Sequence, residues 1–154
     1  MFQENAVNCL KNGELTLFSD IITESTGKDL ESNGKVLPND HWINQNLRSE
    51  DDKTLLLVAI DLGNKHEYVK ILLQSGANPS LMNYDLKVTP LIYASKKKDL
   101  ESIRLLTQFG ADLNSVALNN GQTALHVACE RGFTPAVSYL LTCKGIGGAD
   151  GIGK

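Results

Sequence analysis

The residues that could form a phosphate-binding site lie at the end of the sequence. Residues 148–154 read G-x-x-x-x-G-K, the start of a P-loop, in which backbone N–H groups and a lysine hold phosphate groups. That site also needs a preceding β-strand, a hydroxyl side chain after the lysine and a helix behind the loop. Residues 143–147 do not have the composition of a strand, and no hydroxyl residue follows Lys154. We therefore expect a glycine-rich tail over residues 144–154 and no cofactor.

His126 and Cys129 have the residue types of a base and a nucleophile, and they lie three residues apart on about the same side of a predicted helix. Cys129 also occupies a small-residue position of that helix, where a cysteine packs like a slightly larger alanine. His41 and His66 have no cysteine or carboxylate at metal-ligand spacing, apart from Glu67. The sequence contains no G-x-S-x-G or H-E-x-x-H motif, so we expect neither catalytic nor metal-binding residues.

Length, composition and charge restrict the class of protein. The 154 residues suffice for one compact domain or a short repeat stack, and the 42% hydrophobic content can form a continuous core. A net charge of -3 argues against a nucleic-acid partner. The three cysteines form no C-x-x-C pair, and the longest apolar run, residues 55–60, is too short to span a membrane. We expect a cytoplasmic protein, with the nucleus as an alternative location, and no membrane partner.

A six-residue pattern recurs along the chain with a period near 34 residues. The sequence TPLIYA at 89–94 is matched by TALHVA at 123–128 and by TLLLVA at 54–59. A second signature, GAN at 76–78, returns as GADLN at 110–114. A period of this length predicts stacked units, each of which needs its neighbours to bury its apolar face.

Each unit carries the pattern of two helices. The first has apolar or small residues at i, i+3 and i+4, and the second has pairs of apolar residues on one stripe, so the two predict an antiparallel helix pair with one apolar side. Thr89 can cap the first helix of its unit with Pro90 at the first helical position, and residues 134–135 predict the same start for the last helix. Gly76 and Gly110 stand where a left-handed residue ends a helix.

These patterns resemble the ankyrin repeat. The match consists of T-P-L-x-x-A, a glycine nine residues after the threonine, a stripe of leucine type and G-A-D-x-N, and residues 120–132 follow it most closely. The resemblance implies an all-α solenoid of helix-turn-helix units with projecting hairpin loops and a concave face. It also implies that His126 is a structural residue that bonds the loop backbone. The units fall at about 4–24, 52–82, 86–116 and 120–143, within one domain over 1–143 that contains an insertion at about 25–50.

The resemblance further implies a non-catalytic protein-interaction module, an adaptor or scaffold that binds another protein or peptide on the concave face and hairpin tips. Leu62, Leu86 and Val88 are apolar where we do not expect the fold to require it, as anchors of an interface are. Trp42 is the candidate anchor outside the repeats, although it could equally fold down to cap the first or second unit. The expected contact residues are Trp42, Lys53, Asp61, Leu62, Tyr84, Leu86, Val88, Lys96, Lys97, Asn119, Gln122, Glu130 and Arg131.

Several alternatives stay open at the level of the sequence. Residues 50–52 are an acidic run that fits either a solvated hairpin tip or an attractor for a basic peptide. Residues 96–98 are three lysines that fit either a helix C-terminus or the contact for an acidic partner. Residues 119–132 are similar to repeats of the IκB family, so a stand-alone inhibitor that sequesters a transcription factor, or a kinase, is the alternative function. Without a polar cap, the C-terminal end could support self-association.

Overall fold

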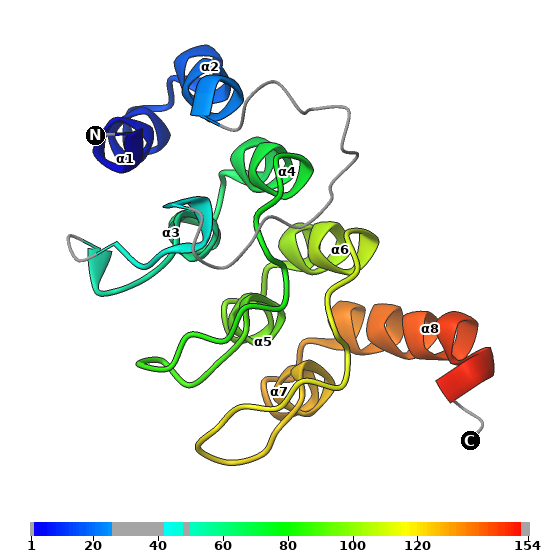
Figure 1. Cartoon of the computed structure of the whole chain (residues 1–154). Helices are drawn as coiled ribbons and strands as arrows, with labels where there is room; N and C mark the ends of the chain where they lie inside the picture. The colour runs from blue at the N-terminus through cyan, green and yellow to red at the C-terminus, as the bar shows by residue number, and fades with distance from the viewer. Residues whose placement is uncertain (1, 26–41, 48–49, 152–154) are drawn as a thin grey trace.

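The computed structural model describes residues 2–25, 42–47 and 50–151. Within these ranges the chain forms four pairs of α-helices that stack side by side, as Figure 1 shows. This is the all-α ankyrin solenoid that the sequence predicts. The helices are α1 (Phe2–Asn12), α2 (Leu15–Ser25), α3 (Leu55–Leu62), α4 (His66–Gln74), α5 (Pro90–Lys96), α6 (Leu100–Gln108), α7 (Ala124–Glu130) and α8 (Thr134–Gly151), with a short 3-10 helix η2 (Trp42–Asn44) before α3.

The pairs form two rows of helices. The first helices, α1, α3, α5 and α7, lie in one row, the second helices lie in the other, and each helix contacts the next in its row (Figure 1). Hairpin loops extend from the row of first helices. Leu47 pairs with Lys53 and Asn83 with Val88 in isolated antiparallel bridges. In the third hairpin the N–H of Ala117 donates to the carbonyl oxygen of Gln122 at 2.8 Å.

Threonine caps start three of the first helices. The hydroxyl oxygens of Thr54, Thr89 and Thr123 each accept from the backbone N–H three residues ahead, at 3.3, 3.4 and 3.3 Å. Each threonine has extended backbone angles, and Pro90 takes the first helical position after Thr89. The recurring threonine therefore marks where α3, α5 and α7 begin, as predicted for Thr89.

The last helix starts differently from the prediction. α8 begins at Thr134, and the carbonyl oxygen of Phe133 accepts from the N–H of Val137 at 3.1 Å. Thr134 consequently lies inside the first turn instead of capping it. The reason is the register of the repeat, because Phe133 stands 34 residues after Asp99, which caps α6.

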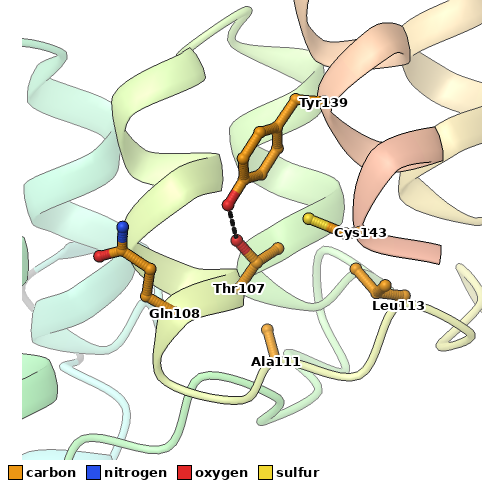
Figure 2. Close-up of a pocket in the computed structure, with 6 residues that line it drawn as sticks. All are labelled: Thr107, Gln108, Ala111, Leu113, Tyr139 and Cys143. Carbon is orange, nitrogen blue, oxygen red and sulfur yellow. Dashed lines mark hydrogen bonds between the residues drawn. The ribbon is translucent and has the colours of Figure 1, made fainter. Parts of the chain in front are cut away.

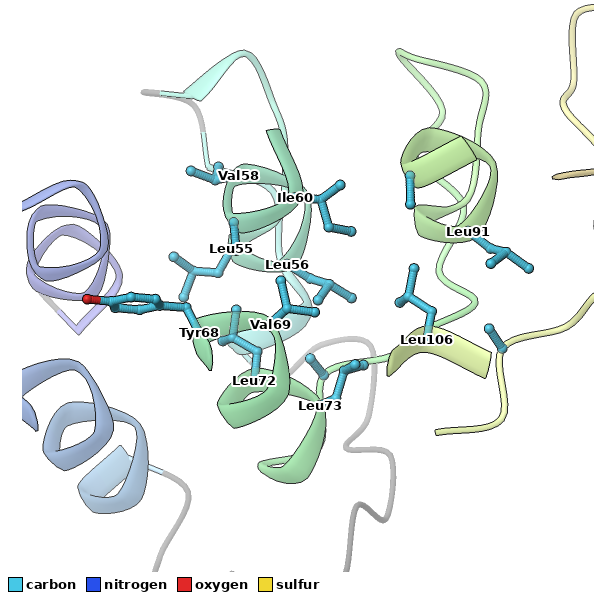
Figure 3. Packing of buried hydrophobic residues seen from close by; sticks show 14 of the residues in the cluster. Leu55, Leu56, Val58, Ile60, Tyr68, Val69, Leu72, Leu73, Leu91 and Leu106 are labelled. Carbon is cyan, nitrogen blue, oxygen red and sulfur yellow. The ribbon is translucent and has the colours of Figure 1, made fainter. Parts of the chain in front are cut away.

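Leucine, isoleucine and valine side chains from successive pairs form one continuous core (Figure 3). In each first helix one position is small and almost fully buried, as Ala59, Ala94 and Ala128 are, so neighbouring helices can approach closely. The large core residues that Figure 3 labels are Leu55, Leu56, Val58, Ile60, Tyr68, Val69, Leu72, Leu73, Leu91 and Leu106.

The insertion is shorter than the predicted range of about 25–50. The side-chain oxygen of Asn44 accepts from the N–H of Asn78 at 2.8 Å, and Ile43 is buried like Ala77. Residues 43–44 therefore occupy the place that 77–78 occupy one repeat later, and the extra residues lie before Trp42. Residues 26–41 and the side chain of Trp42 lie outside the described part of the structure.

The second helix of the fourth pair is longer than predicted. α8 continues to Gly151 across the range where the sequence indicates a glycine-rich tail. No proline follows Pro135, so every later residue retains the N–H that a helix requires. Among the described helices, none is both long and apolar enough to cross a membrane.

Candidate protein-interaction surface

Asp61, in the last turn of α3, joins three elements of the concave face, by which we mean the hairpin loops and the exposed side of the first helices. Its Oδ2 lies 3.2 Å from Nζ of Lys53 in the preceding hairpin. Its Oδ1 lies 2.7 Å from Nζ of Lys97 and accepts a hydrogen bond of 2.6 Å from the hydroxyl of Tyr93, both from the next repeat. Asp61 therefore brings together three predicted contact residues, itself included with Lys53 and Lys97, and adds Tyr93, which was not predicted.

The two acidic groups of this cluster have shifted pKa values. Partial burial alone would raise the pKa of Asp61, but hydrogen bonds from Lys97, Tyr93 and Lys53, with the charge of Lys53, lower it from 3.8 to about 2. Burial and the bond to the Asp61 carboxylate raise the pKa of the Tyr93 hydroxyl. Asp61 is thus ionised and Tyr93 neutral at pH 7, which fixes the direction of the hydrogen bond.

The contact between Lys53 and Asp61 has a counterpart in the fourth repeat. Nε2 of Gln122 donates to Oε2 of Glu130 at 2.8 Å, and these residues occupy the positions of Lys53 and Asp61. In both repeats a polar side chain from the residue before the cap therefore runs along the first helix to its last turn. Lys96 holds the position of Asp61 in the third repeat and is partly buried.

The next position along each first helix faces solvent. Leu62, Lys97 and Arg131 occupy equivalent places at the C-terminal ends of α3, α5 and α7, and all three are exposed. Leu62 is 40% exposed although it is a large apolar residue. These three predicted contact residues thus mark the same position on three successive repeats of the concave face.

The tips of the second and third hairpins carry a pair of exposed apolar side chains. Tyr84 is 74% exposed and Leu118 is 53% exposed. The N–H of Leu118 donates to the carbonyl oxygen of Lys87 at 2.9 Å, so the two tips are bonded to each other. Leu118 was not predicted, although its distance of 34 residues from Tyr84 could have identified it. Asn119, which was predicted, is exposed beside it.

Two predicted contact residues support the fold instead. Val88 is 1% exposed, and it exchanges backbone hydrogen bonds with Asn83 at 2.8 and 3.2 Å. Its side chain lies in the core because it precedes the cap Thr89 at the base of the hairpin. Leu86 is partly buried against the core, and its N–H donates to the side-chain oxygen of Asn83 at 2.8 Å. Val88 is therefore removed from the interaction surface, and Leu86 contributes only its exposed part.

The acidic run before α3 divides between two environments. Glu50 forms an ion pair with Lys11 of α1, whereas the side chain of Asp51 is 93% exposed. Asp51 and Asp52 both have positive φ angles, of 54° and 57°, at the tip of the first hairpin. The run is thus partly a link between the first two repeats.

His126 is the structural residue that the resemblance implies. Its Nδ1 accepts from the backbone N–H of Thr123 at 3.1 Å, which completes a capping box with the threonine hydroxyl. Cys129 is exposed, whereas Ser95 and Ile60 at the equivalent positions are fully buried. The prediction that Cys129 packs like an alanine is therefore wrong, because no described residue stacks on this side of the fourth repeat.

His66 takes part in a link between repeats that spacing alone did not reveal. Its Nε2 donates to Oδ1 of Asp99 at 2.8 Å, while Oδ2 of Asp99 accepts from the hydroxyl of Ser102 at 2.7 Å. Asp99 also caps α6 through the N–H of Ser102 at 3.2 Å. Because both carboxylate oxygens are engaged in caps and links, this cluster is structural. No group of three or more potential metal ligands occurs among the described residues.

A hollow of about 290 Å³ opens between α6 and α8, away from the concave face (Figure 2). The hydroxyls of Tyr139 and Thr107 lie 2.7 Å apart across it, and Arg104 stacks over the tyrosine ring at 5.4 Å. Burial raises the pKa of Tyr139. None of the residues that line the hollow is a lysine, arginine, histidine, aspartate or glutamate. They are Thr107, Gln108, Ala111, Leu113, Tyr139 and Cys143.

Comparison with known proteins agrees with this geometry. The family model for ankyrin repeats in three copies matches residues 56–150. The mouse (Mus musculus) B-cell lymphoma 3 protein homolog is 34% identical over 95 residues, which are 62% of this chain and 21% of that protein. The NAD-dependent deacetylase sir2B of Dictyostelium discoideum is 31% identical over 129 residues, 77% of this chain and 16% of that protein.

A putative ankyrin repeat protein of Fowlpox virus is 28% identical over 102 residues, 66% of this chain and 16% of that protein. The chain thus spans about a fifth or less of the length of these relatives. The family match covers more than half of the chain, and the chain belongs to the ankyrin-repeat family.

Proposed function

We propose that the chain is a non-catalytic module that binds another protein or peptide through its concave face, as an adaptor or scaffold. Ankyrin repeats are protein-interaction modules, and the family is generally non-catalytic. The observation that carries the proposal is the set of exposed apolar residues, Leu62, Tyr84 and Leu118, on a surface whose helices are bonded across repeats. Apolar side chains on a rigid face are the usual anchors of an interface.

The relatives support a role as a module within different proteins. They range from a lymphoma protein homolog to a deacetylase, and this chain corresponds to a small part of each. The part that these relatives share with this chain is the repeat stack. The name deacetylase therefore refers to the whole of the larger Dictyostelium protein. A cytoplasmic or nuclear location belongs to the same proposal and can be checked by imaging a fluorescent fusion.

A paired capture experiment tests the concave face. We would compare Leu62→Glu/Tyr84→Glu with the control Leu17→Glu/Leu141→Glu, whose residues are 52% and 53% exposed on the second helices. Capture of cellular partners should be lost in the first variant and retained in the control, with circular dichroism unchanged in both. Equal capture by both variants would remove the concave-face assignment.

The stand-alone inhibitor similar to the IκB family is the second candidate, supported by the sequence of residues 119–132. It would use the same face, so the two candidates differ in what binding does to the partner. Loss of the captured partner's activity on addition of this chain would favour the inhibitor. Self-association through the end of the stack is a separate proposal, supported by exposed Leu141, and the solution mass tests it.

A further inference from the structure

We propose that the concave face of the third and fourth repeats binds an acidic peptide segment. The inference rests on the proposed function and names the chemistry of the partner. It depends on three features of this part of the surface, namely its charge, the backbone conformation of two lysines, and the position of the apolar hairpin tips.

The charge of the concave face is divided along the stack. Residues 83–98 and 117–132, which form the hairpins and first helices of the third and fourth repeats, carry five lysines and arginines and only two carboxylates. Residues 50–61 of the second repeat carry four carboxylates and one lysine. These charges sum to +3 in the third and fourth repeats and to -3 in the second, and the ion pair between Lys97 and Asp61 joins the two parts. An acidic segment is attracted to the positive part and repelled by the other.

Two of these lysines occupy backbone positions that favour glycine. Lys98 has a φ of 58°, and the equivalent residues in the neighbouring repeats are Gly63 and Gly132, with φ of 84° and 67°. Lys87 has a φ of 62°, where the next repeat has Gly121 at 70° and the preceding repeat has Asp52 at 57°. A side chain in the left-handed region is disfavoured, and such positions cluster at functional sites. The attraction of lysine to a helix C-terminus would explain residues 96–98 but not the hairpin lysine.

Apolar groups lie beside this charge. Lys87 bonds through its carbonyl oxygen to Leu118, and Tyr84 lies in the same hairpin as Lys87. The ligand that fits is therefore a segment with several carboxylates and at least one large apolar residue, which would contact the tips while its carboxylates face the lysines. Arg131, exposed just after α7, adds a positive charge on the concave face of the fourth repeat.

The test measures fluorescence anisotropy with three labelled pools of twelve-residue peptides at pH 7 and low salt. The pools share the same apolar positions and differ only in having acidic, basic or neutral polar residues elsewhere. We expect the acidic pool to bind at least about tenfold more tightly than the neutral pool, and to weaken as salt increases. A twelve-nucleotide single-stranded DNA provides the comparison with another polyanion.

The variant Lys96→Glu/Lys98→Glu should lose the preference for the acidic pool. Glutamate is compatible with position 96, because the equivalent residues are Asp61 and Glu130. The control Lys70→Glu/Arg104→Glu makes the same change of charge on the second helices and should bind within about twofold of the wild type. Lys98→Gly removes one charge without straining the backbone. It should weaken binding of the acidic pool about threefold and should raise the melting temperature.

Four results would overturn the inference. The first two are neutral or basic pools that bind as tightly as the acidic pool, and a control variant that loses as much affinity for the acidic pool as Lys96→Glu/Lys98→Glu does. The other two are DNA that binds more tightly than the acidic pool, and no binding of any pool. None of these decides the proposed function, because capture of partners by the wild type and its loss in Leu62→Glu/Tyr84→Glu are measured independently.

Discussion

The hydroxyl of Tyr93 donates a hydrogen bond of 2.6 Å to Oδ1 of Asp61, and this bond joins the first helices of two successive repeats. The same carboxylate contacts Lys53 and Lys97, so one acidic side chain holds a hairpin and two helices in register. Lys97 also lies 5.5 Å from the centroid of the Tyr93 ring. The concave face is thus ordered by polar contacts as well as by the core beneath it.

Stability should depend on the ionisation of Asp61 at low pH. Its pKa is about 2 in the folded chain and near its ordinary value of 3.8 when unfolded, so its contribution is present above pH 4 and is lost as the pH falls towards 2. Because the side chain is 33% exposed, screening limits this contribution to about 1 kcal/mol. Urea unfolding should show Asp61→Asn less stable than wild type at pH 6, and this difference should shrink at pH 3. If the difference in the free energy of unfolding between the two proteins did not change with pH, the lowered pKa of Asp61 would be contradicted.

Asp99 should be a point of high sensitivity because it caps α6 and also bonds to His66 in the previous repeat. Asp99→Ala removes both roles and should lower the free energy of unfolding by about 2 kcal/mol. Asp99→Asn retains a side-chain oxygen for the cap, so its cost should be less than half as large. Chemical denaturation monitored by circular dichroism distinguishes these values, and equal losses would show that the cap is unimportant.

Exchanging lysine and glycine at equivalent turns should have opposite effects. Lys98→Gly relieves a left-handed side chain and should stabilise the fold by about 0.5–1 kcal/mol. Gly132→Lys creates the same strain and should cost about 1 kcal/mol, since a Cβ at Gly132 meets no heavy atom within 4 Å. Melting temperatures of the two variants provide the measurement. If neither changes stability, the left-handed conformation is not a cost at Lys98.

Alanine substitutions at Val88 and Leu62 should have different effects on stability, because one side chain lies in the core and the other on the surface. Val88→Ala should lower the free energy of unfolding by about 1–2 kcal/mol because the side chain is 1% exposed. Leu62→Ala should stay within about 0.5 kcal/mol of the wild type, because that side chain is 40% exposed. Equilibrium unfolding in urea checks both. A costly Leu62→Ala would place that residue in the core and remove it from the interaction surface.

The repeat pattern was sufficient to predict the fold. Thr89 and its counterparts set the start of the first helices, and Gly76 and Gly110 have the predicted left-handed angles, with φ of 102° and 87°. The repeat period did not predict the structure where extra residues interrupt it. The equivalence of residues 43–44 to 77–78 was missed because the extra residues come just before 43–44. The period also could not show that α8 extends to Gly151.

The surface was harder to predict because exposure depends on neighbours outside the local pattern. Val88 and Leu118 are both apolar residues of hairpins, yet one pairs at the base and the other lies at a tip. Links such as His66 with Asp99 join residues about one repeat apart. A sequence period indicates that such residues are close, but it does not indicate which pairs form bonds.

Position-specific photo-crosslinking tests the central claim most directly. A photoreactive phenylalanine analogue would replace Leu62, Tyr84 or Leu118 on the concave face, and Leu17 or Leu141 on the second helices, all of which are at least 40% exposed. The concave-face account predicts that the first three positions crosslink a common set of proteins in cell extract and that the other two do not. Crosslinks confined to Leu17 or Leu141, or equal at all five positions, would contradict it.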